Sequence, residues 1–248
     1  MDAFEPVRRT SLPGQVFDQL ADRIVSGTMA PGALLPSERK LAELLGVNRG
    51  AVREAIRRLE QAGLVTTRHG GGSQVRDFRT SAGPELLPRL LFRGGRVDTK
   101  VARGVLEMRN VLGPEIAAVA ATRAGDGARR TVAALAARMA EDAPLPALQD
   151  RSLALWDALV RATDNVAFEL SFNALRAAYE PIARTLLTAM APELRDAEGH
   201  QALGRAVERG EADAARRAAA RILARSKAGF DRLLHGIADL CAEREDTP

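Results

Sequence analysis

Residues 34–75 read LLPSERKLAELLGVNRGAVREAIRRLEQAGLVTTRHGGGSQV, and this stretch decides the fold of the first third of the chain. It contains two segments with apolar residues at helical spacing, separated by the helix-breaking Gly46. Ser37 and Asn48, one before each segment, are residue types that commonly cap helix N-termini through a side-chain oxygen. Gly63 ends the second segment. The stretch therefore predicts two helices joined by a tight turn.

A β-hairpin is predicted directly after the second helix. The runs 64–68 and 73–76 have the length of short strands, and the glycines between them suit a tight tip. An earlier helix is predicted at 13–27, where apolar residues recur four positions apart. Two short helices joined by a glycine-containing turn and followed by a hairpin are typical of a winged helix-turn-helix.

The N-terminal face of the second helix carries the residues that are expected to meet DNA. Arg49, Gly50 and Arg53 lie off the apolar stripe, at the helix end that would enter a major groove first. Arginine can donate two hydrogen bonds to guanine, and glycine lets the backbone come close. His69, at the hairpin tip, is placed to reach a minor groove or a phosphate. Two alternatives stay open: the arginines form an ordinary solvated helix face, and His69 is a plain surface residue.

Positive charge is concentrated in the same region. Residues 39–76 hold eight Arg or Lys and three acidic residues, whereas residues 80–248 hold 24 basic and 23 acidic residues. A basic segment beside a nearly neutral one is typical of a nucleic-acid-binding arm attached to a partner domain. The alternative is that the arginine-rich surface only reflects an Arg- and Ala-rich composition.

The segments LPSER, LAELLGV, RGAVREAIRRLE and AGLV closely resemble signatures of the GntR family of bacterial transcription regulators. The RHG turn and the following DFRTSAG are most similar to the FadR subfamily. The resemblance implies a homodimer that binds a short palindromic operator in double-stranded DNA. Gly50 replaces a threonine common in the family, which implies an altered operator preference. By the resemblance, the residues that touch DNA are Arg39, Asn48, Arg49, Gly50, Arg53, His69 and Gly70.

Beyond residue 97 almost every segment has helical periodicity, and no strand is predicted after residue 80. The predicted fold class is mainly α: an N-terminal winged helix-turn-helix with a small β-hairpin, and a C-terminal all-α bundle of six to seven helices. The expected domains are a DNA-binding domain at 1–79, a linker with a short helix at 80–97, and an effector-binding and dimerisation domain at 98–248. The helical segments are expected at 84–93, 101–119, 128–142, 148–163, 168–186 with an interruption at Pro181, 195–209 and 211–242.

The stretches VLEMRNVLGPEIAAVAA, ALVRATDN and GHQALGRAVERGEADAARRAA are similar to the FCD ligand-binding domain that accompanies this branch of the family. Many FCD domains hold a metal ion with one Asp and three His. Here Ser152, Trp156 and Ile222 occupy three of those positions, and only His200 matches. One donor cannot hold a transition metal, so neither metal nor cofactor is expected. His200 is a candidate effector contact, with the alternative that it is a buried or cap-forming histidine.

Loss of the metal ligands changes which effector is expected. Trp156 and Ile222 make the predicted cavity more apolar, as an acyl chain would need. The charged end of the effector would then require an arginine: Arg109, where the family keeps one, or Arg161 or Arg184. The FadR-like features imply a long-chain acyl-CoA or a fatty acid, and a small organic acid is the alternative. It also stays open that Arg109 pairs with a neighbouring acid and that Trp156 is ordinary core.

Composition limits the remaining function classes. The 248 residues include no run of eighteen apolar residues, so no membrane span is expected, and the N-terminus lacks a signal-peptide core, which favours a cytoplasmic protein. Cys241 is the single cysteine, so no intrachain disulfide is possible. Three scattered histidines form no Ser-His-Asp or Cys-His constellation, so an enzyme is not expected. The rival is an effector-independent architectural DNA-binding protein, which would have a small C-terminal cavity or none.

Overall fold

The computed structural model describes residues 11–68, 72–93 and 96–245 of the chain. The chain divides into two compact units, Met1–Leu86 and Leu87–Pro248. Within these ranges, only the backbone is described for residues 93, 96, 181, 184, 185 and 238–245.

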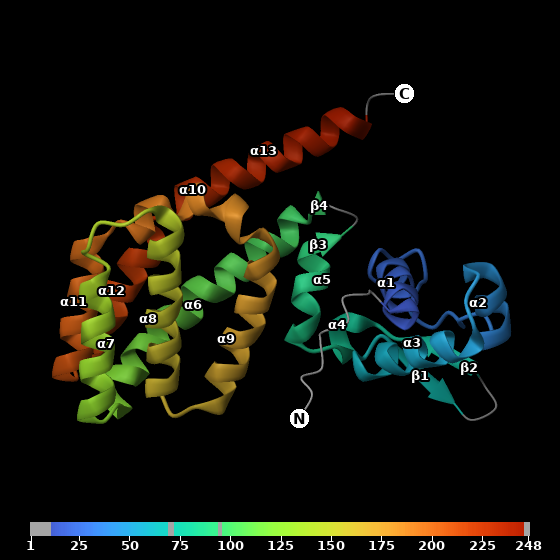
Figure 1. Cartoon of the computed structure of the whole chain (residues 1–248), viewed down its shortest axis with the longest axis horizontal. Coiled ribbons are helices and arrows are strands. Elements are labelled where there is room, and N and C mark those ends of the chain that lie inside the picture. The colour runs from blue at the N-terminus through green and yellow to red at the C-terminus, as the bar shows by residue number, and fades with distance from the viewer. Residues whose placement is uncertain (1–10, 69–71, 94–95, 246–248) are drawn as a thin grey trace, which may run out of the picture. The chain divides into compact units, whose positions relative to one another are not determined.

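The helices of the N-terminal unit begin where the sequence supplies caps (Figure 1). Ser37 Oγ accepts a hydrogen bond from the Lys40 amide at 3.3 Å, and Asn48 Oδ1 accepts one from the Ala51 amide at 2.8 Å. Gly46 ends the intervening helix in a left-handed conformation with a φ of 64°. Both predicted caps are thereby confirmed. The elements of this unit are α1 (Leu12–Val25), α2 (Glu38–Leu45), α3 (Arg49–Gln61), β1 (Val65–Arg68), β2 (Gly72–Val75), α4 (Phe78–Ser81) and the 3-10 helix η1 (Pro84–Leu86).

A small apolar core joins these elements. α3 packs on α1 and α2, and its inward stripe includes Val52 and Leu59, which have no exposed surface. β1 and β2 pair antiparallel, with Val65 opposite Val75. An isolated bridge between Leu34 and Gln74 adds the loop before α2 to the hairpin. The predicted winged helix-turn-helix is confirmed.

The C-terminal unit is helical, and the predicted all-α bundle is confirmed. Two predicted helices are each divided in the structure. The segment 168–186 is broken at Pro181, where an interruption was expected, because proline lacks the amide hydrogen that continues a helix. The segment 211–242 is broken near Ser226, which lies between α12 and α13 and whose backbone carbonyl accepts a hydrogen bond from the Phe230 amide at 2.9 Å. The elements are α5 (Leu87–Leu91), β3 (Phe92–Arg93), β4 (Arg96–Val97), α6 (Thr99–Arg123), α7 (Asp126–Arg138), α8 (Leu145–Ala162), α9 (Val166–Tyr179), the 3-10 helix η2 (Glu180–Ile182), α10 (Ala183–Leu194), α11 (Ala197–Arg209), α12 (Ala212–Ala224) and α13 (Lys227–Glu245).

The expectation of no strand after residue 80 was wrong. β3 and β4 are two residues each and pair antiparallel, with Phe92 opposite Val97. Strands this short contain no alternation of apolar and polar residues, so the sequence carried no signal for them.

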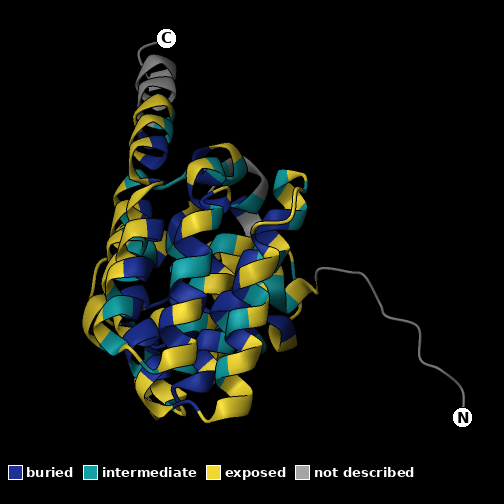
Figure 2. Cartoon of the chain, turned by 90° about the vertical axis from the view of Figure 1, so that its left-hand side faces the viewer, coloured by how far each residue is buried: buried dark blue, intermediate teal, exposed yellow. Residues whose placement is uncertain are grey.

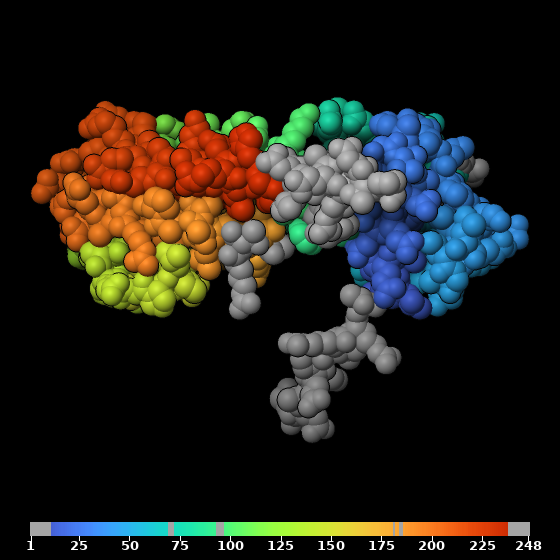
Figure 3. Space-filling view, turned by 90° about the horizontal axis from the view of Figure 1, so that it is seen from above, coloured from blue at the N-terminus to red at the C-terminus, as the bar shows by residue number. Residues whose placement is uncertain are grey.

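α6 is the central helix of the bundle and crosses it diagonally (Figure 1). It packs against α12. Both helices bury small side chains completely: Ala117, Ala120 and Ala121 on α6, and Ala215 and Ala219 on α12. Figure 2 shows that buried residues follow the inward faces of the helices and exposed residues the outward faces. Figure 3 shows side chains of α11 beside those of α12, as one continuous surface.

No helix in the described ranges is long and apolar enough to span a bilayer.

Gly63 leaves no room for a side chain. Its φ is +70°, and a Cβ built on it would lie 2.2 Å from the carbonyl oxygen of Ser81. Gly63→Ala is expected to lower the free energy of unfolding of the N-terminal unit by more than the about 1–2 kcal/mol that a left-handed backbone alone costs alanine. Native-state hydrogen exchange of the α3 amides measures this loss. The control is Gly27→Ala, where φ is +78° but nothing lies within 4 Å of the added Cβ. Equal losses in both variants would contradict the steric explanation.

Candidate functional site

The N-terminal end of α3 presents a polar face to solvent. Arg49, Gly50 and Arg53 are all exposed, as the spacing predicted. A Cβ at Gly50 would lie 3.2 Å from Asn48 Oδ1, the oxygen that caps this helix. Among the described residues, Arg49 has no ion-pair partner, so its guanidinium is available to a phosphate or a base edge.

Arg53 is held by an acid from the preceding helix. Its Nε lies 3.2 Å from both carboxylate oxygens of Glu38, and its Nη2 lies 2.9 Å from Oε2. The hydrogen bonds from Arg53 hold the pKa of Glu38 below its ordinary value. Glu38 therefore stays ionised and orients the guanidinium before any DNA is present. Glu38 stands within the LPSER segment but was not among the predicted site residues.

Arg39 makes a weaker, local pair. Its Nη1 lies 2.8 Å from Glu43 Oε1, one helical turn along α2, and both side chains are largely exposed. A solvated pair of this kind contributes little to stability, so DNA phosphates can replace Glu43 as the partner of Arg39.

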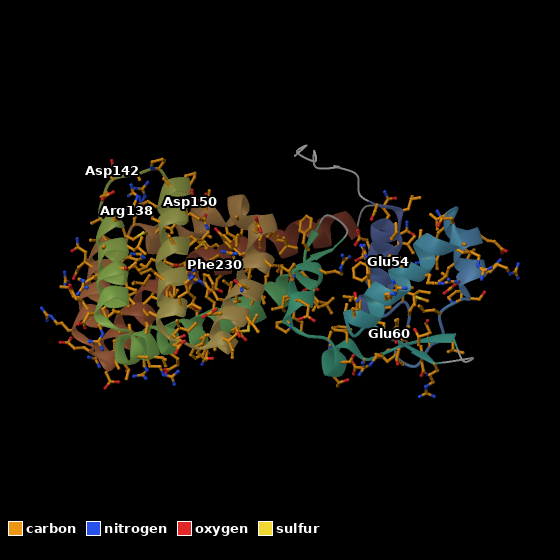
Figure 4. All side chains as sticks on the ribbon, turned by 60° about the horizontal axis from the view of Figure 1, so that its bottom comes forward. Glu54, Glu60, Arg138, Asp142, Asp150 and Phe230 are labelled. Atoms are coloured by element: carbon orange, nitrogen blue, oxygen red, sulfur yellow. The ribbon has the colours of Figure 1, made fainter. Side chains whose placement is uncertain are left out.

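The hairpin is fastened to α3 by a carboxylate. Glu60 Oε1 accepts a hydrogen bond from the backbone amide of Thr67 in β1 at 2.8 Å. Figure 4 labels Glu60 on α3, where it reaches toward the hairpin. Two of the predicted DNA contacts, His69 and Gly70, lie outside the described residues. The remaining five are brought together on α2 and on the cap and first turns of α3.

The C-terminal unit encloses a cavity of about 140 Å³. Its walls come from α5, β4, α6, α8, α9, η2, α10, α12 and α13, and nearly all of the lining surface is apolar. Phe230, labelled in Figure 4 among the side chains between the helices, is one of the lining residues. Trp156, which replaces a metal ligand of related domains, also lines the cavity. An apolar cavity of this kind suits an aliphatic ligand.

The three candidate arginines have different surroundings. Arg109 lines the cavity, as expected. Arg161 does not: its side chain is 74% exposed and its Nε lies 2.9 Å from Asp157 Oδ2, one turn along α8. This correction follows from the helix register, which directs Arg161 to solvent. The side chain of Arg184 lies outside the described part of the structure.

His200 and Ile222 lie in the core and do not line the cavity. His200 has no exposed surface, and its Nδ1 donates to the Asp196 carbonyl at 2.8 Å. Ile222 packs against α11 at Gly199, the residue before His200. Among the described residues, no three His, Cys, Asp or Glu side chains gather as a metal ion would need. The geometry of His200 is that of a buried structural histidine.

A cluster of polar groups lies at the cavity wall around Arg109, the one member that was predicted from the sequence. Arg109 Nη2 donates to Glu193 Oε1, and Ser226 Oγ donates to Glu193 Oε2 at 2.6 Å. Arg109 is therefore paired with an acid, which was the alternative left open. Tyr179, the chain's only tyrosine, lines the cavity with a buried hydroxyl. Glu193 and Ser226 are distant in sequence from Arg109, and no local pattern indicated either of them.

Burial lowers the pKa of His200 below 6.5. As the pH falls through 6.5, this imidazole takes up a proton in the unfolded chain but stays neutral in the folded chain. The free energy of unfolding therefore decreases as the pH falls. His200→Gln keeps an amide donor for Asp196 but does not titrate. Its free energy of unfolding is expected to fall less between pH 7.5 and pH 5, by at most about 1.4 kcal/mol per pH unit.

Urea unfolding followed by the fluorescence of Trp156, the only tryptophan of the chain, measures this in the C-terminal unit. His235→Gln, which removes an exposed histidine and leaves His200 in place, is the control and retains the loss in acid. Parallel pH curves for the wild type and His200→Gln would contradict the assignment.

Known proteins match both units. Residues 12–75 match the family model "Bacterial regulatory proteins, gntR family", and residues 104–225 match the FCD domain. The HTH-type transcriptional regulator Mce2R of Mycobacterium tuberculosis is 43% identical over 89% of this chain and 92% of its own length. A fatty acid metabolism regulator protein of Edwardsiella ictaluri is 29% identical over 72% of this chain and 73% of its own.

A solved structure shares the fold. That of Lar, which controls the expression of the Listeria monocytogenes agr system, has a TM-score of 0.52 at 18% identity and covers 94% of this chain and 100% of its own. The matching families and relatives are transcriptional regulators and not enzymes. With a relative 43% identical across nearly its whole length, the chain belongs to the GntR family and is a DNA-binding transcriptional regulator with an FCD ligand-binding domain.

Proposed function

We propose that the protein is a cytoplasmic repressor whose operator binding is controlled by an effector with a long apolar chain, either an acyl-CoA or a fatty acid. Residues 1–79 bind DNA, residues 80–97 connect the two functions, and residues 98–248 bind the effector and form a homodimer. The single observation that carries the proposal is the apolar cavity inside the FCD domain. An architectural protein without effector control has no need of such a cavity.

The DNA-binding part of the proposal rests on exposed charge. Arg49 and Arg53 project from the first turns of α3, and Arg39 projects from α2. Asn48, Gly50, His69 and Gly70 complete the proposed contact set. Two copies of this head on a palindrome would double the few contacts that one winged domain can make.

The effector class rests on the lining of the cavity. The lining is almost wholly apolar, which favours a hydrocarbon chain over a small, highly charged organic acid. The name of the relative from Edwardsiella ictaluri agrees with this class but carries little weight at 29% identity.

The cavity also offers a route for control. Leu91 of α5 and Val97 of β4 are among the lining residues, and both follow closely after the boundary between the two units. A ligand that fills the cavity acts directly on this segment. A ligand that binds one arrangement of the segment more tightly than another shifts the equilibrium, with a coupling of about 1–3 kcal/mol.

Arg49→Ala and Arg53→Ala are each expected to weaken operator binding by about 1–3 kcal/mol, because each removes a forked donor from the recognition face. The measurement is fluorescence anisotropy on a duplex that the wild-type protein selects from a randomised pool. Arg130→Ala is the control, since it removes an exposed arginine from α7 in the other unit. Unchanged affinity in both test variants, relative to this control, would refute the recognition-helix assignment.

Val105→Phe fills part of the cavity from α6 and is expected to abolish the release of operator DNA by dodecanoyl-CoA, while DNA affinity without ligand stays as in the wild type. Val111→Phe is the matched control: it is the same change on the same helix, at a side chain that points to solvent with 67% exposure. Release measured by anisotropy should persist in the control. Equal release in the two variants would mean that the cavity is not the effector site.

A further inference from the structure

The buried polar groups at the cavity wall carry no net charge. Arg109 is the charged residue of the lining whose side chain is mostly buried, at 22% exposure, and it is neutralised by Glu193, which has no exposed surface. Gln149 and Ser152, the other buried polar residues of the lining, are uncharged. A cavity built to hold a free carboxylate would instead present an uncompensated cation to it.

Both carboxylate oxygens of Glu193 accept hydrogen bonds from the protein. One carboxylate oxygen accepts from Arg109 and the other accepts from Ser226 at 2.6 Å. The pair joins α6 to α10, and Ser226 joins both to the start of α13, so three elements of the cavity wall hold the carboxylate in place. A ligand carboxylate beside Arg109 would place a second anion next to this one in an apolar surrounding, where like charges repel strongly.

Two hydrogen-bond donors remain unused at this point. Arg109 Nη1 and the hydroxyl of Tyr179 are both buried and have no hydrogen-bond partner among the described residues. The two side chains line the same cavity, Arg109 from α6 and Tyr179 from α9. Burial raises the pKa of Tyr179, which therefore stays a neutral donor. Buried donors without partners are costly, so a bound molecule that accepts from both would be stabilised.

We infer that the effector presents an uncharged carbonyl oxygen, as in an ester, thioester or ketone, to Arg109 and Tyr179, and that Glu193 excludes free carboxylates from this position. The inference rests on the proposed function, since it names the head group of the ligand of the same cavity. It separates the two effectors proposed above: the thioester carbonyl of an acyl-CoA fits the polar end of the cavity, and a fatty acid does not.

Arg176 offers the only competing cation in the described lining. It lines the cavity from α9 but is exposed, and it has no ion-pair partner among the described residues. A charged group held by Arg176 would stay in contact with water. It would leave Arg109 Nη1 and Tyr179 without acceptors.

The test compares three probes with similar chains on the full-length protein at pH 8: methyl dodecanoate, dodecanoate and dodecane. Quenching of Trp156, which lines the cavity and is the only tryptophan, reports binding. Methyl dodecanoate is expected to bind about tenfold or more tightly than both other probes, because only it supplies a neutral acceptor.

Glu193→Gln removes the negative charge and keeps an acceptor for Arg109 and a donor for Ser226. The preference is expected to reverse in this variant, with dodecanoate bound more tightly than the ester. Glu141→Gln, at an exposed acid that pairs with Arg151, is the control and keeps the wild-type order. Tyr179→Phe, which needs no change in the ion pair, is expected to weaken the ester about fivefold or more and to leave dodecane unchanged.

The possible failures are distinguishable. If none of the three probes binds, the cavity is not an effector site and the proposed function fails together with the inference. If all three bind equally, the proposed function stands and the inference is overturned. The inference is also overturned if the wild type prefers dodecanoate and Arg176→Gln removes that preference, because the head group then lies at Arg176.

Discussion

The ion pair between Arg109 and Glu193 is the constraint on which the C-terminal unit depends. Transfer of a carboxylate into an interior built from leucine and alanine is very unfavourable unless the charge is compensated and both oxygens are hydrogen-bonded. Arg109 and Ser226 meet both conditions. Because the three residues come from α6, from α10 and from the turn before α13, the condition can be met only when those elements are in place. The same contact therefore sets the helix arrangement and the polarity of the cavity.

The local features of the chain could be predicted because their causes are local. Ser37 and Asn48 cap helices through amides three residues away, and Gly46 takes the left-handed conformation its position requires. The apolar character of the cavity could also be predicted, since Trp156 replaces a polar metal ligand of related domains. The exposure of Arg161 could also have been predicted from the sequence, because Asp157 stands four residues before it, at the spacing of a helical ion pair.

The polar end of the cavity could not be predicted, because its residues are far apart in the sequence. Glu193 is 84 residues from Arg109, and Ser226 is a further 33 residues along. Nothing in the neighbourhood of either residue indicates burial of a charge: Glu193 sits near the end of an ordinary helix, directly after a proline. Only the arrangement of α6, α10 and α13 within the bundle brings these groups together. Partnerships across a helical bundle of this kind depend on the three-dimensional fold and leave no periodic signature.

The hydrogen bond from the Thr67 amide to Glu60 connects the two parts of the DNA-binding head. It fixes the hairpin to the C-terminal turn of α3, while the bridge from Leu34 to Gln74 fixes the same hairpin to the loop before α2. These two contacts hold the hairpin at a fixed distance from α3. In the proposed dimer, an effector would then change the distance and angle between the two heads and not the geometry within either head. The length of DNA that each head contacts would stay the same.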